Sequence, residues 1–66
     1  MKIVISNSSS VPIYEQIKNT IIEQIMSGEL AENEALPSIR ALALDIKISV
    51  MTIKKAYDDL EKEGYI

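Results

Sequence analysis

The sequence contains neither cysteine nor histidine, and these two absences exclude most of the common chemistries of protein sites. Without thiols there is no disulfide and no thiolate metal site. Without imidazole the usual general base at neutral pH is missing, and the chain has no glycine-rich phosphate loop. Asp58 and Asp59 would point about 100° apart on a helix, so they could not easily share a metal ion or a proton. We therefore expect no enzyme, no cofactor and no metal.

Aromatic residues are also few, because the chain has three tyrosines but no phenylalanine or tryptophan, although 47% of its residues are hydrophobic. A core built from Ile, Leu, Val and Ala suits short packed helices better than a sandwich. At 66 residues the chain holds one small domain at most. No apolar run approaches the roughly 18 residues of a membrane span, and the N-terminal run is too short for a signal peptide. We expect a soluble, cytoplasmic domain.

Positive charge is in deficit overall, yet it is concentrated in one part of the chain. Seven basic residues stand against ten acidic ones, whereas a nucleic-acid-binding domain is usually basic. The window from Arg40 to Lys55 nevertheless holds four basic residues against one acid, Asp45, so it carries +3 while the rest carries −6. This segregation makes the window a candidate binding region.

The N-terminal part predicts a short strand and one helix. Lys2–Ile5 is a β-branched run typical of an edge strand. A helix is expected from Pro12, with Ser10 as its cap and Gly28 as its stop. Apolar residues recur at helical spacing along one face of this helix. They are Ile13, Tyr14, Ile17, Ile21, Ile22, Ile25 and Met26.

The middle of the chain predicts a helix-turn-helix. Residues 29–36 form a connector anchored by Leu30 and Leu36, with Asn33 suited to a left-handed backbone. A second helix begins at Pro37–Ser38 with Ser38 as its cap, and the next cap is Ser49. The apolar stripe of that second helix consists of Ile39, Leu42, Ala43 and Ile46. Only 45–48 separate it from Ser49, which is the spacing of a helix-turn-helix.

The third helix is expected to run from Val50 to Glu63 and to stop at Gly64, with Tyr65 and Ile66 opening a strand. Its core face is predicted to hold Val50, Ile53, Ala56, Tyr57 and Leu60. Its outer face then shows Met51, Thr52, Lys54 and Lys55 in the N-terminal half. The free N–H groups beside Ser49 favour binding of a phosphate. In helix-turn-helix proteins, the N-terminal residues of the second helix reach base edges in the major groove.

Each of these residues also has a plain structural interpretation. Two adjacent lysines on a surface helix are more often a solvated face than a binding site. Ser38 and Ser49 are N-caps first, although a cap hydroxyl can also bind a ligand. Exposed Met51 is either an incidental surface residue or an apolar contact for a thymine methyl group. The residues alone leave these alternatives open.

A family resemblance is carried by Leu36–Ile66, LPSIRALALDIKISVMTIKKAYDDLEKEGYI. This segment resembles the N-terminal winged helix-turn-helix domain of GntR-type bacterial transcription regulators. The residues that match the family pattern are Gly28, Leu30, Leu36, Pro37, Ser38, Arg40, Leu42, Ala43, Ile48, Ser49, Thr52, Ile53, Ala56, Glu63 and Gly64. Upstream, VPIYEQIKNTI after a short apolar strand is similar to the YtrA-like subgroup.

The resemblance implies a mainly α, three-helix winged helix-turn-helix domain over residues 1–66, with a short N-terminal strand and a truncated wing hairpin. It implies sequence-specific binding of a palindromic double-stranded DNA operator by a homodimeric repressor, with an unknown effector. The DNA-binding residues that it implies are Ser38, Arg40, Ser49, Val50, Met51, Thr52, Lys54 and Lys55. The effector and dimerisation region is expected to be absent from this chain.

Departures from the family pattern limit the resemblance. Val50 stands where many members have arginine, and Lys47 and Asn33 stand where glycine is common. A left-handed backbone at Lys47 would cost about 1 kcal/mol. Because the chain stops at Tyr65–Ile66, where the first wing strand should begin, we expect a fragment with weak DNA affinity. The alternative hypothesis is a small acidic helical module for protein–protein interaction.

Overall fold

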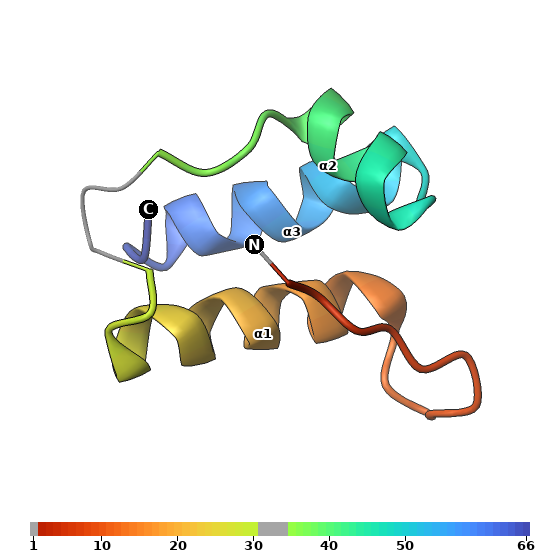
Figure 1. Cartoon of the computed structure of the whole chain (residues 1–66), viewed down its shortest axis with the longest axis horizontal. Helices are drawn as coiled ribbons and strands as arrows, with labels where there is room; N and C mark the ends of the chain where they lie inside the picture. Colours follow the sequence, from red (N-terminus) through yellow and green to blue (C-terminus); the bar gives the residue numbers. More distant parts are fainter. Residues whose placement is uncertain (1, 31–34) are drawn as a thin grey trace.

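The computed structural model describes residues 2–30 and 35–66 and contains three helices. These are α1 (Ile13–Ser27), α2 (Ile39–Ile46) and α3 (Val50–Lys62). Helix α3 packs against both α1 and α2 and lies between them (Figure 1). The mainly α, three-helix prediction is confirmed, while the prediction for Asn33 lies outside the described residues. None of these helices combines the length and the apolar character needed to cross a membrane.

The core is aliphatic and draws on all three helices. Its buried members are Ile17, Ile21, Leu30, Leu42, Ala43, Ile53, Ala56 and Leu60. Leu30 and half-buried Leu36 anchor the two ends of the connector as predicted. Two predicted core residues are wrong, because Met26 is 78% exposed and Val50 is 41% exposed. Both lie at helix ends, in the last turn of α1 and at the first residue of α3.

Serine caps begin α2 and α3 as the sequence predicts. Ser38 Oγ accepts from the Ala41 N–H at 3.0 Å, and Ser49 Oγ accepts from the Thr52 N–H at 3.2 Å. Such caps satisfy N–H groups that have no partner inside the helix. The predicted Ser10 cap of α1 is wrong, because the cap position is Pro12 and has no side-chain hydrogen bond.

The N-terminal segment is extended but pairs with glutamine side chains instead of a strand. Gln16 Oε1 accepts from the Ser6 N–H at 2.9 Å, while its Nε2 donates to the Ser6 carbonyl at 3.0 Å. Gln24 Nε2 donates to the Lys2 carbonyl at 2.9 Å, so the segment runs antiparallel along α1. Ile3 and Ile5 pack against the core. The predicted strand at Lys2–Ile5 is therefore wrong, since residues 2–30 and 35–66 contain no β-strand.

The C-terminal end of α3 closes with a Schellman motif. Gly64 is left-handed, with φ 85°, and its N–H donates to the Glu61 carbonyl at 3.1 Å. The Tyr65 N–H donates to the Leu60 carbonyl at 2.9 Å. Tyr65 also packs against the core. In the described part of the chain, Tyr65–Ile66 therefore form no strand, which corrects that prediction.

The turn between α2 and α3 depends on a left-handed lysine. Lys47 has φ 57° and ψ 45°, and its N–H donates to the Ala43 carbonyl. The Ile48 N–H donates to the same carbonyl at 3.1 Å, so two hydrogen bonds end α2 and redirect the chain toward Ser49. A Cβ atom is unfavourable in this conformation. The turn thus stores backbone strain at Lys47.

Replacing Lys47 by glycine should relieve this strain. We expect Lys47→Gly to raise the free energy of unfolding by about 0.5–1 kcal/mol, after the greater freedom of glycine in the unfolded chain is counted. Urea denaturation measures the change. Lys47→Ala is the control, since it removes the charge but keeps the Cβ atom. An equal gain in stability for both variants would show that charge, not backbone strain, is responsible.

Tyr57 should make stability fall at alkaline pH. Its hydroxyl donates to the Pro37 carbonyl at 2.7 Å, and partial burial raises its pKa above the usual value. Folding therefore favours the neutral phenol, so this contribution is complete below the unfolded pKa of about 10 and is lost as pH rises through the folded pKa. We expect Tyr57→Phe to show a shallower loss of stability than wild type above about pH 10.

Urea unfolding of both proteins across this pH range measures the effect, and the comparison cancels the contributions of groups that the two proteins share. Identical pH profiles for the two proteins would contradict a role for the Tyr57 hydroxyl.

Candidate nucleic-acid interface

The structure brings the start of α2 beside the middle of α3. The hydrogen bond from the Tyr57 hydroxyl to the Pro37 carbonyl, at 2.7 Å, joins the two directly. Ser38 and Arg40 follow Pro37 and are exposed. Lys54 comes one turn before Tyr57 on the same side of α3. The two groups of predicted site residues, one on each helix, therefore belong to one region of the fold.

Most of the predicted residues at the N-terminal end of α3 are exposed. Ser49, Val50, Met51, Lys54 and Lys55 all reach solvent, and Met51 is 75% exposed. Thr52 is only half-buried, and its hydroxyl lies 2.8 Å from Ser49 Oγ. This hydroxyl pair sits at the N-terminal end of the helix, where the macrodipole is positive. The N-terminal end of α3 thus presents two apolar side chains, two hydroxyls and two cations.

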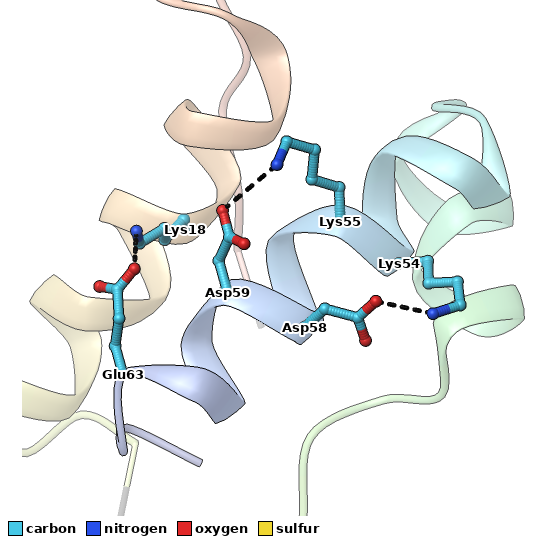
Figure 2. Close-up of polar contacts among 6 residues, drawn as sticks. All are labelled: Lys18, Lys54, Lys55, Asp58, Asp59 and Glu63. Carbon is cyan, nitrogen blue, oxygen red and sulfur yellow. Dashed lines mark hydrogen bonds and ion pairs between the residues drawn. The ribbon is translucent and has the colours of Figure 1, made fainter.

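Lys54 and Lys55 diverge around α3 and pair with two consecutive aspartates (Figure 2). Lys54 Nζ lies 2.6 Å from Asp58 Oδ2 on the same helix. Lys55 Nζ lies 3.7 Å from Asp59 Oδ2 and 4.5 Å from the centroid of the Tyr14 ring on α1. Lys55 therefore also contacts a neighbouring helix, whereas the ion pair of Lys54 stays within α3.

The electrostatics keep Lys54 cationic at neutral pH. Its hydrogen bond to Asp58 raises the pKa of Lys54 above the usual value, and the charge attraction of Asp58 adds to this. The two side chains are 56% and 59% exposed. Exposed pairs of this kind are weak and open easily. Lys54 is thus a charged group that a stronger anion can capture.

A third ion pair holds the C-terminal end of α3 against α1. Lys18 on α1 donates to Glu63 just beyond α3 (Figure 2). This hydrogen bond raises the pKa of Lys18. With the Lys55–Tyr14 contact in the middle of α3, it links α1 and α3 at two points along α3. The outer face of α3 is consequently held in one orientation.

A shallow hollow lies between the starts of α1 and α3. It measures about 400 Å³ and is lined by Ile13, Tyr14, Met51, Thr52 and Lys55. Its apolar walls can accept a methyl-sized group, and the lysine can meet a phosphate. No group of three metal-ligand side chains occurs among the described residues. The apolar walls and the lysine of this hollow suit a ligand that carries both phosphates and small apolar groups.

Sequence reasoning missed two features of this region. The first is the pairing of the lysines with Asp58 and Asp59, although the four-residue spacing was a readable signal. The predicted basic half of α3 is thus present but partly neutralised. The second is the Tyr14 contact with Lys55, which depends on how α1 packs on α3 and leaves no signal in the spacing of residues.

The chain matches the family model for "Bacterial regulatory proteins, gntR family" over residues 13–66. The HTH-type transcriptional repressor YtrA of Bacillus subtilis (strain 168) is 44% identical over 64 residues, which cover 97% of this chain and 49% of that protein. The HTH-type transcriptional repressor NagR of the same organism is 40% identical over 62 residues, which cover 94% of this chain and 26% of that protein.

A solved structure gives the same result. YtrA from Sulfolobus acidocaldarius, a GntR-family transcription factor, matches with a TM-score of 0.92 and 47% identity, covering 94% of this chain and 66% of that one. The chain thus spans about half the length of the Bacillus YtrA repressor and about a quarter of NagR. The family match covers most of the chain, and both helix N-termini described above fall within it. The protein belongs to the GntR family of bacterial regulatory proteins.

Proposed function

We propose that this chain is a sequence-specific DNA-binding domain of a bacterial transcription regulator, and that the regulator is a repressor. The observation that carries the proposal is the exposed N-terminal half of α3, held outward beside the capped start of α2. Two curated relatives are named HTH-type transcriptional repressors, which supports the same conclusion. Helix α3 would lie in the major groove, with the start of α2 against the DNA backbone.

The site residues divide into two roles under this proposal. Arg40, Lys54 and Lys55 meet phosphates, because they are cations in the first half of each helix. The hydroxyls of Ser38, Ser49 and Thr52 and the apolar Val50 and Met51 lie close enough to the helix starts to meet sugars, phosphates or base edges. Met51 is suited to a thymine methyl group because it is exposed beside an apolar hollow.

The wider properties of the regulator form part of the same proposal. We propose that residues 1–66 act as one winged helix-turn-helix domain, that the regulator works in the cytoplasm as a homodimer, and that its operator is palindromic. The first point is supported by the one core that the described residues form. The symmetry of a dimer would be mirrored in two operator half-sites about one helical turn apart, roughly 34 Å.

One observation favours a second candidate function, an acidic protein–protein interaction module. The chain carries −3 overall, and the lysines of α3 are paired with aspartates. The dependence of affinity on salt separates the two functions. Contacts to DNA phosphates release condensed counterions, and binding to a protein partner lacks this release. A DNA-binding domain must lose affinity steeply as salt rises.

The test begins by selecting duplexes from a random library with the protein. Affinities for a selected duplex and its scrambled version are then measured between about 50 and 200 mM salt. We expect both affinities to fall with salt and the selected duplex to bind more tightly than its scrambled version at every salt concentration. Equal binding of both duplexes, or binding that salt does not weaken, would overturn the proposal.

Lys54→Ala should weaken binding to the selected duplex and reduce the salt slope by about one unit, because one phosphate contact is lost. Lys62→Ala is the matched control: it removes the same charge from an exposed site in the last turn of α3, away from the proposed interface. The same change in slope for both variants would remove Lys54 from the interface.

A further inference from the structure

We propose that Asp58 lowers the attraction of this domain for non-operator DNA by holding Lys54 in an ion pair within α3. This inference rests on the proposed DNA-binding function and assigns a specificity-determining role to a residue outside the predicted contact set. The pair is direct, with 2.6 Å between Lys54 Nζ and Asp58 Oδ2. Both side chains extend from the same face of α3 (Figure 2).

The two consecutive lysine–aspartate pairs are not equivalent. Lys55 is held by the Tyr14 ring on α1 as well as by Asp59, so loss of Asp59 leaves it a second partner. Among the described residues, Asp58 is the one partner of Lys54 in an ion pair or a side-chain hydrogen bond. The orientation of Lys54 therefore depends on Asp58 far more than that of Lys55 depends on Asp59.

Competition for Lys54 differs between the two kinds of DNA complex. On non-operator DNA, phosphates attract the protein through intervening water, and the aspartate at 2.6 Å is the closer anion. On the operator, base contacts fix α3 in the groove and bring a phosphate within direct reach of Lys54. An exposed pair is weak enough to exchange Asp58 for that phosphate. Asp58 thus selects against loose binding more than against specific binding.

One hollow beside Met51 is consistent with this exchange. It is lined by Met51, Lys54, Lys55, Asp58 and Asp59, so both ion pairs open onto the surface where DNA is proposed to lie. The carboxylate is therefore placed to act on DNA through Lys54 and not through the core.

The test measures the affinity of Asp58→Asn for random duplex DNA and for a duplex selected by the wild type. We expect affinity for random duplex to rise about two- to fivefold, the salt slope on it to steepen by about one unit, and the ratio of selected to random affinity to fall. Asp59→Asn is the matched control on the same helix and should change the ratio less. Circular dichroism confirms that each variant is folded.

A double-mutant cycle decides whether Asp58 acts through Lys54. In a Lys54→Ala background, Asp58→Asn should no longer raise affinity for random duplex. A full rise in that background, or equal effects of Asp58→Asn and Asp59→Asn, overturns this inference while leaving DNA binding intact. Wild-type binding that is insensitive to salt would instead overturn the proposed function itself, and this inference with it.

Discussion

The burial of one face of α3 between α1 and α2 is the constraint on which the rest of the structure depends. Ile53, Ala56 and Leu60 are completely buried there, and each large apolar side chain contributes about 1.5–3 kcal/mol when it leaves water. In a domain this small, the core leaves little stability to spare. Because this face is committed to the core, Met51, Lys54 and Lys55 are directed to solvent, where a partner can reach them.

Contacts at the rim of the core refine this arrangement. The Tyr57 hydroxyl bonds to Pro37 on the α2 side, and Lys55 lies over Tyr14 on the α1 side. These contacts act on opposite sides of α3 and resist its rotation about its own axis. The cap at Ser49 then fixes where the helix begins. A DNA-binding helix needs this control, because successive residues lie about 100° apart around the helix axis. A shift of one residue would therefore expose a different face.

Much of this fold could be predicted from local sequence signals. The spacing of apolar residues defined all three helices, and Ser38, Ser49 and Gly64 marked their ends correctly. Such signals act over one or two turns and need no knowledge of the tertiary structure. Exposure at helix ends was harder, because Val50 and Met26 follow the apolar pattern but lie where packing against neighbours stops.

Tertiary contacts were the part that sequence reasoning could not supply. The β-branched run at Lys2–Ile5 predicted a strand, but Gln16 and Gln24 bind the backbone of Ser6 and Lys2, and these residues come together only in the folded chain. At the candidate site, the exposed cations were predictable. The pairing of Lys54 with Asp58 could be predicted from their four-residue spacing. The contact of Lys55 with Tyr14 could not, because Tyr14 lies on another helix.

The central claim is that the starts of α2 and α3 form the DNA-binding surface. Amide NMR spectra of the labelled protein, recorded while a selected duplex is added, test this most directly. The account predicts that the shifted amides cluster at Ser38–Arg40 and at 49–55, with little change at 22–27 in the last turns of α1. Shifts concentrated on α1, or none at saturating duplex, would contradict it.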